Sequence, residues 1–255
     1  MVTDPPPDVR WQALLVGVAS NAYSDDRGFA QSLNSQAELA RALERNMPGL
    51  RDDSLIVLPE PRYAHEVTEA IALLNEEHDN DFLAGRACPG LLFYYCGHGL
   101  NADGQLYLSV VETIDKDHNR RRTGLALSAV LETLGTTEWC DRERIVLILD
   151  CCFAGLACKE PAAQGAHLLM AVGPDVLATH DPSSTGPTYF TGALVELLRE
   201  GDPEAGPWID LDTAYRLLKP RLVARHGKDR QPYQQPVNGS GAIVLGRNVA
   251  YSGSG

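Results

Sequence analysis

The sequence predicts an α/β protein whose central sheet is mostly parallel and is covered by helices on both faces. Short apolar runs typical of buried strands alternate along the 255 residues with stretches of helical periodicity. These runs are continuously apolar, which is the pattern of strands covered on both sides. No repeat or break in composition divides the chain, so we expect one domain over 11–247 with flexible tails at 1–10 and 248–255.

The first half of the chain contains three expected strands. The apolar run WQALLVGVA predicts a strand at 11–19, and a polar loop follows at 20–27. Apolar residues then recur every three or four positions over 29–43, which predicts a helix. The run SLIVL predicts a strand at 54–58, the apolar face of 65–74 predicts a helix, and GLLFYYC predicts a central strand at 90–96.

The second half completes a sheet of six strands. The alternating segment 105–111 indicates a short excursion or a hairpin, and the highly charged segment 112–123 indicates a solvated loop. A helix is expected at 125–134, followed by the apolar strand RIVLIL at 144–149. A fifth strand at 166–172, helices at 189–200 and 211–224, and a short sixth strand at 242–245 finish the order.

Charge and cysteine content limit the possible partners and the compartment. The 22 basic and 34 acidic residues give a net charge of −12, which repels phosphate backbones and anionic membranes, so we expect no nucleic-acid or membrane partner. No apolar run is long enough to span a bilayer, and the proline-rich start is not a signal peptide. The six cysteines do not have the spacing of a secreted disulfide framework, so we expect a cytoplasmic protein.

Reactive side chains follow two of the expected strands. His98, flanked by two glycines, comes directly after the strand at 90–96, and the pair Cys151–Cys152 follows the strand at 144–149. In parallel sheets the active-site residues lie at the carboxyl ends of the strands. These two segments therefore define a candidate Cys–His pair for nucleophilic catalysis. Either segment alone is a weak signal, because a cysteine after a strand is usually a packing residue.

The two segments, YYCGHG at 94–99 and DCCFAG at 150–155, resemble the histidine and nucleophile motifs of the caspase-like cysteine peptidases. They resemble the metacaspase and bacterial caspase-like branch, not the Gln-Ala-Cys-x-Gly block of animal caspases. The likeness extends in order over 11–247 and includes Val16-Gly17-Val18, Tyr189-Phe190-Thr191 and Gln231-Pro232. It implies a caspase-like fold and a cysteine-type endopeptidase. Cys152 would be the nucleophile, His98 its acid–base partner, and the backbone N–H groups of Gly99 and Cys152 the oxyanion donors.

The resemblance also implies a substrate pocket that accepts Arg or Lys before the scissile bond. Asp150 matches the acid of that pocket, and Cys96 occupies the small position before Gly97. The second acid of the family's pocket is missing, because Ser35-Gln36 stands where the family has Asn-Asp. Asp25 and Asp26, in the loop after the first strand, either strengthen the attraction for basic residues or are simply solvated.

Further expectations concern partners, processing and cofactors. The resemblance implies protein or peptide substrates, regulated proteolysis, and other domains or effectors of a signalling or defence system as partners. Lys159 is the basic residue between the nucleophile and the fifth strand, so it is the candidate for autocleavage. Some metacaspases need calcium, so activation by calcium stays open, but the acidic clusters here lack EF-hand spacing, and we expect no cofactor and no required metal.

Three other functions compete with the peptidase hypothesis. The first is a catalytically silent caspase-like module that binds partners. The second is a metal-binding protein, since the four cysteines from Cys140 to Cys158 lie near His167, but no Cys-x₂₋₄-Cys pair occurs. The third is a flavodoxin-like or nucleotide-binding domain, which is disfavoured because no glycine-rich phosphate loop follows the first strand.

Overall fold

Six strands form the central sheet of the computed structural model, which describes residues 10–21, 29–85, 89–135, 142–176, 185–235 and 243–252. The sheet has the order β10-β8-β7-β3-β1-β2. Its strands are β1 (Trp11–Gly17), β2 (Leu50–Pro59), β3 (Gly90–Cys96), β7 (Ile145–Asp150), β8 (His167–Met170) and β10 (Tyr233–Gln235). All pairs are parallel except β10 with β8, so the mostly parallel six-stranded sheet predicted from the sequence is confirmed.

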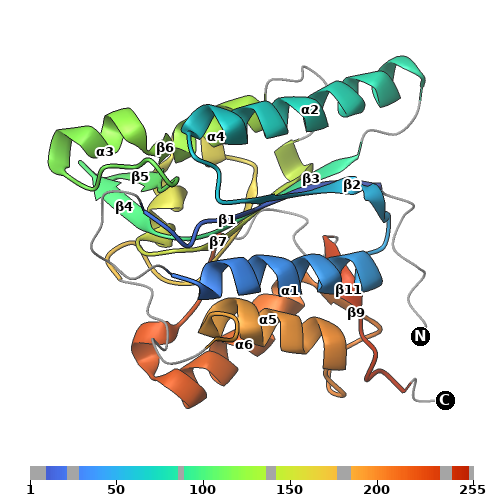
Figure 1. Ribbon diagram of the computed structural model, residues 1–255. Helices are drawn as coiled ribbons and strands as arrows, with labels where there is room; N and C mark the ends of the chain where they lie inside the picture. The colour runs from blue at the N-terminus through green and yellow to red at the C-terminus, as the bar shows by residue number, and fades with distance from the viewer. Residues whose placement is uncertain are drawn as a thin grey trace.

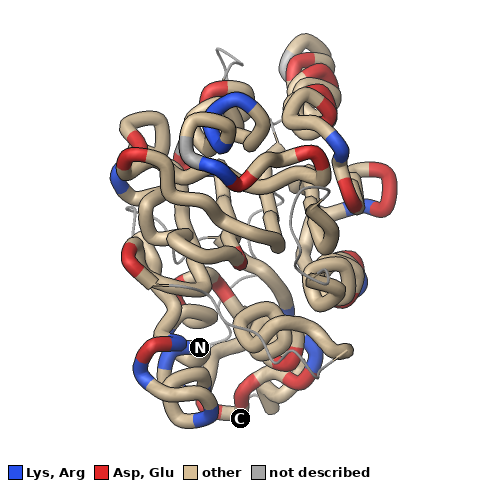
Figure 2. Tube along the Cα trace, turned by 60° about the vertical axis from the view of Figure 1, so that its left-hand side comes forward, with Lys and Arg blue, Asp and Glu red and all other residues tan. Residues whose placement is uncertain are grey.

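Helices cover both faces of this sheet (Figure 1). One face carries α1 (Gln31–Asn46), α5 (Tyr189–Glu200) and α6 (Leu211–His226), and the other carries α2 (Ala64–Leu83) and α4 (Leu127–Leu134). Every residue of β1, β3 and β7 is buried between these layers, which explains why their sequences are continuously apolar. Charged side chains lie mainly on the helices and loops around the sheet (Figure 2).

The sixth strand of the sheet is not the one predicted. The C-terminal strand β11 (Val244–Arg247) pairs with β9 (Trp208–Asp210) in a separate two-stranded sheet, so the assignment of 242–245 to the main sheet is wrong. The sixth position belongs to β10, whose sequence is Tyr-Gln-Gln. A short strand at the edge of a sheet is less buried than a central one, so its sequence need not be apolar. The apolar pattern that marks central strands is therefore missing from it.

A small sheet extends from the end of β3. The strands β4 (Gly99–Ala102), β5 (Gln105–Leu108) and β6 (Leu125–Ala126) pair antiparallel, so a hairpin is present, but it spans 99–108 and ends before 109–111. The prediction of a solvated loop over 112–123 is wrong in its second part, because α3 (Asp117–Thr123) forms there. The Thr123 hydroxyl donates to the Asn119 carbonyl at 2.8 Å and accepts from the Ile114 N–H at 2.9 Å, so side-chain hydrogen bonds fold this polar stretch.

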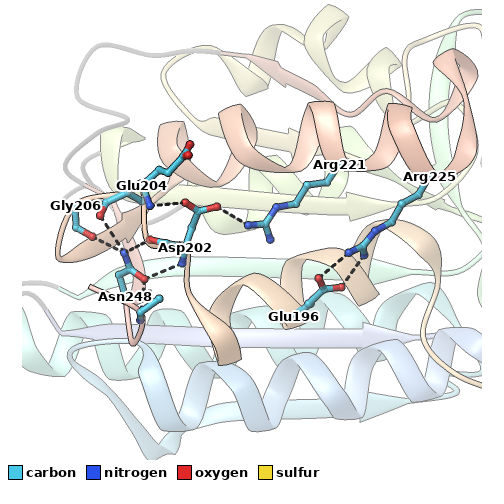
Figure 3. Close-up of polar contacts among 9 residues, drawn as sticks. Glu196, Asp202, Glu204, Gly206, Arg221, Arg225 and Asn248 are labelled. Atoms are coloured by element: carbon cyan, nitrogen blue, oxygen red, sulfur yellow. Dashed lines mark hydrogen bonds and ion pairs between the residues drawn. The ribbon is translucent and has the colours of Figure 1, made fainter. Parts of the chain in front are cut away.

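The packed part of the chain extends beyond Arg247 into the stretch expected to be a flexible tail. Asn248 is only 2% exposed, and its side chain bonds to the loop after α5 (Figure 3). Its Oδ1 accepts from the N–H of Asp202 at 2.9 Å and of Ala250 at 3.2 Å. Its Nδ2 donates to the carbonyls of Asp202, Ala205 and Gly206 at 2.8, 3.2 and 2.7 Å.

Candidate active site

The register of the sheet brings the two predicted reactive residues to the same edge. Cys96 of β3 pairs with Asp150 of β7, so His98 and Cys152 each lie two residues beyond a matched pair. Both side chains are partly exposed, and both line one pocket of about 220 Å³. His98 and Cys152 therefore line one pocket at the carboxyl ends of neighbouring parallel strands, and their roles as a catalytic pair stay a prediction.

The turn after β7 separates the two adjacent cysteines. Both cysteines line the pocket, but Cys151 is only 1% exposed and belongs to the core, where burial raises the pKa of its thiol well above the usual value, whereas Cys152 is partly exposed. Phe153 adopts the left-handed conformation (φ 57°, ψ 17°), which is uncommon for a residue with a side chain. Its N–H donates to the Val176 carbonyl at 3.0 Å. The chain then enters the 3₁₀ helix η2 (Ala154–Lys159). Cys152 therefore lies in a sharp turn that the hydrogen bond of Phe153 holds in place.

The loop that carries His98 is fixed by contacts to the strand before it. The Tyr95 hydroxyl lies 3.1 Å from the His98 carbonyl oxygen and 2.8 Å from that of Ser109. The Ser109 N–H donates to the same His98 carbonyl at 2.9 Å. The ring of Phe29 lies 5.7 Å from the imidazole, centroid to centroid. These hydrogen bonds hold the backbone of His98, and the Phe29 ring packs beside its imidazole.

Gly99 packs directly against the backbone of the candidate nucleophile. A Cβ atom at Gly99 would lie 2.0 Å from the Cys152 carbonyl oxygen and 3.0 Å from Cys151 Sγ. Because the Ser109 N–H bonds to the His98 carbonyl, the next pair, Gly99 with Leu108, is of the non-hydrogen-bonded kind. The Gly99 N–H therefore points away from β5, and only glycine allows the two chain segments to approach this closely.

Asp150 forms a buried, negatively charged part of the pocket wall. It is 3% exposed, and its Oδ2 accepts hydrogen bonds from the hydroxyls of Thr188 and, at 2.6 Å, of Thr191. Thr188 also caps α5, because its hydroxyl accepts from the Thr191 N–H at 3.2 Å. Burial raises the pKa of the Asp150 carboxyl, while both threonine hydroxyls act in the opposite direction. The positive end of the α5 dipole favours the carboxylate in the same way.

The substrate-binding role expected of Cys96 is not supported, because Cys96 is fully buried and no substrate can reach it. Cys96 is paired with Asp150 across the two strands, and a hydrogen bond from its thiol acts to lower the pKa of that carboxyl. Ser35 and Gln36 are likewise used within the protein. The Ser35 hydroxyl accepts from the Thr188 N–H at 2.9 Å, and Gln36 Nε2 donates to the Leu15 carbonyl at 2.7 Å.

The other predicted residues are not brought into the pocket. Asp25 and Asp26 lie outside the described residues, so their expected role stays a prediction. Lys159 is exposed at the end of η2, and the N–H of the following residue bonds to the Ala157 carbonyl at 3.2 Å. Among the residues that the structure describes, no three His, Cys, Asp or Glu side chains form a potential metal site.

Sequence reasoning missed most of the pocket wall. Phe29 comes from the segment before α1, Thr188, Tyr189 and Phe190 from the start of α5, and Leu222 and Arg230 from α6 and the turn after it. The motif segments at 189–191 and 231–232 pointed to these regions, but nothing in the pattern indicated that their side chains face the nucleophile. Arg230 is the important omission, because it places a positive charge in the same pocket as Asp150.

Comparison with known proteins identifies the fold. No model of a protein family and no curated protein matches the sequence. Among solved structures, caspase-1 from Spodoptera frugiperda is similar at a TM-score of 0.61 and 14% identity, with 98% of each chain covered. The structure of pro-sf-caspase-1 is similar at a TM-score of 0.58 and 13% identity, covering 92% of this chain and 96% of the other. Within the described part of the chain, no helix has the length and apolar character to span a membrane. The sheet order, the flanking helices and these similarities establish that the chain has a caspase-like fold.

Proposed function

We propose that this protein is a cysteine endopeptidase in which Cys152 and His98 form the catalytic dyad, of the metacaspase and bacterial caspase-like type. The observation that carries the proposal is that both side chains line one pocket at the carboxyl ends of the paired strands β3 and β7. The caspase-like fold supports protein or peptide substrates. We extend the proposal to regulated proteolysis in the cytoplasm, with other domains or effectors of a signalling or defence system as partners.

The reaction follows from the chemistry of the two groups. His98 removes the proton from the Cys152 thiol, and the thiolate attacks the carbonyl carbon of the scissile peptide bond. The resulting oxyanion is bound by the backbone N–H groups of Gly99 and Cys152, and losing one such donor costs about 3 kcal/mol in the barrier. His98 then protonates the leaving amine, and water hydrolyses the thioester to release the acid and restore the thiol.

Specificity is proposed to come from Asp150. Its carboxylate lines the pocket and forms no ion pair with any described residue. It is therefore available to form an ion pair with a basic side chain of the substrate. A guanidinium or ammonium group donates charge-assisted hydrogen bonds to such a carboxylate. We therefore expect a preference for Arg or Lys before the scissile bond. Among the described residues that line the pocket, Asp150 is the only acidic one.

Fluorogenic peptides that differ in the residue before the cleavage point test this function. We expect Arg and Lys peptides to be cleaved in preference to Ala peptides. Activity should be lost in both Cys152→Ala and His98→Ala, whereas the matched variant Cys151→Ala should keep it because Cys151 faces the core. Retained cleavage in Cys152→Ala would refute the assignment of the nucleophile.

The alternative is a catalytically silent interaction module, and a thiol-reactive peptide probe separates the two. A peptidase site should label Cys152 faster than the exposed Cys158, and the His98→Ala variant should label more slowly. Labelling of both thiols at the same rate would favour the interaction module.

A further inference from the structure

Arg230 reaches the pocket from a segment far along the chain. It ends the 3₁₀ helix η4 (Lys228–Arg230), where its N–H donates to the Gly227 carbonyl at 3.1 Å. Three residues later β10 pairs with β8, and the residues after β8, Ala171 and Val172, line the same pocket. The turn and the strand pairing hold the backbone of Arg230 beside the candidate active site.

The guanidinium group of Arg230 has no counter-ion in the part of the chain that the structure describes. Within the described residues it makes no ion pair and no side-chain hydrogen bond, and its Nη1 is buried without a partner. Its Cζ lies 6.0 Å from the centre of the Tyr189 ring, which also stacks on His226 at 3.8 Å. Burial lowers the pKa of His226, and the charges of Arg225 and Arg230 add to this effect. Arg230 therefore gives this wall of the pocket a positive charge that no described carboxylate neutralises.

Two neighbouring arginines of α6 are each paired with a carboxylate, as Figure 3 shows. Arg221 donates to Asp202 at 2.5 Å, and Arg225 makes two hydrogen bonds to Glu196 at 2.7 and 2.9 Å. Each of these exposed or partly exposed charges has a carboxylate, whereas the partly buried Arg230 has none among the described residues. A guanidinium that is removed from water without an anion is unfavourable, so a ligand that brings a carboxylate would gain binding energy here.

Asp150 does not neutralise Arg230, although both line the pocket. Its Oδ2 is occupied by the hydroxyls of Thr188 and Thr191, and no ion pair joins it to Arg230. The pocket therefore presents a negative group and a separate positive group to one ligand. A peptide with a basic side chain alone would leave Arg230 without a partner.

We propose that Arg230 is a specificity-determining residue that binds a substrate carboxylate close to the basic residue held by Asp150. The proposal rests on the peptidase function proposed above and narrows its substrates to sequences in which an acidic residue neighbours the basic residue at the cleavage point. The carboxylate would accept charge-assisted, bidentate hydrogen bonds from the guanidinium.

Matched peptides test the proposal. Every peptide has Arg before the scissile bond. One of the two residues adjacent to this Arg, either the preceding or the following one, is varied, and for each position a Glu peptide is compared with the matching Gln peptide. We expect the Glu peptide to exceed its Gln partner in kcat/KM by roughly ten- to a hundredfold at one position, as for a hydrogen bond between charged groups. The ratio should fall to about one in Arg230→Gln and below one in Arg230→Glu. The control Lys228→Gln, which removes a charge from the same exposed turn, should keep the wild-type ratio. Equal cleavage of every Glu and Gln pair by the wild type would overturn the proposal.

Binding to the Cys152→Ala variant separates this proposal from the peptidase function. Fluorescently labelled Glu peptides should bind this variant more tightly than Gln peptides, and adding Arg230→Gln should remove the difference. If the wild type cleaves nothing but the Arg230-dependent difference in affinity persists, the peptidase function fails and the carboxylate site stands. If affinity is the same for Glu and Gln peptides, the carboxylate site is refuted whatever the catalytic outcome.

Discussion

Replacing Gly99 with alanine is the most direct test of how the two halves of the candidate site fit together. The added Cβ would lie 2.0 Å from the Cys152 carbonyl oxygen, whereas a tolerable contact needs at least 3.0 Å. The φ of Gly99 is not in the left-handed region, so alanine is strained here by the contact and not by its backbone conformation. Either the β4 segment or the turn that carries Cys152 must move by about 1 Å.

The size of the effect can be worked out for stability and for rate. Overpacking of this kind costs about 1–3 kcal/mol in the free energy of unfolding. A displacement of about 1 Å between reacting groups reduces the rate by about a hundredfold. The Gly99 N–H remains in the alanine variant, so a loss of activity would report displacement of the segments and not removal of a donor.

Urea denaturation and kcat/KM on an Arg peptide measure the two effects. Gly192→Ala is the matched control, because Gly192 lies inside α5 with its nearest neighbour, Pro187 Cβ, at 3.7 Å from an added Cβ. This control should be more stable by about 0.5–1 kcal/mol, since alanine favours a helix over glycine. A Gly99→Ala protein with wild-type stability and wild-type kcat/KM would refute the close packing of the His98 loop against Cys152.

Three further predictions concern other parts of the molecule. Burial raises the pKa of Asp150 in the folded state, so ionisation of its carboxyl destabilises the fold. The free energy of unfolding of the wild type, relative to that of Asp150→Asn, should therefore fall as the pH rises from about 4 through the folded-state pKa. Thermal melts across this range check it, and a difference that does not change with pH would contradict it. Asn248→Ala leaves five backbone groups without their partner and should cost about 3 kcal/mol in urea denaturation, whereas Val249→Ala, at a side chain that is 54% exposed, should stay within about 0.5 kcal/mol. Autocleavage after Lys159 should be slow, because the peptide bond lies in a hydrogen-bonded turn, and intact-mass analysis should find the fragments in the wild type but not in Cys152→Ala.

Most of the central sheet was predictable because its strands are buried on both sides. Continuous apolar runs marked β1, β3 and β7, and a parallel arrangement requires their carboxyl ends to share one edge. That reasoning also predicted that His98 and Cys152 meet, since each follows such a strand. The same pattern misplaced the sixth strand, because β10 is a polar edge strand and β11 is an apolar strand outside the main sheet.

Sequence alone determined which side chains end the buried strands, because burial of the backbone leaves a strong local signal in the residue types. The tertiary structure alone decided what surrounds them: Thr188 bonded to Asp150, Cys96 buried on the strand beside it, and Arg230 in the same pocket with no counter-ion among the described residues. The walls of the pocket come from segments that are distant in the chain. Their relative placement depends on how helices and edge strands pack on the sheet, and no local pattern of residues encodes that packing.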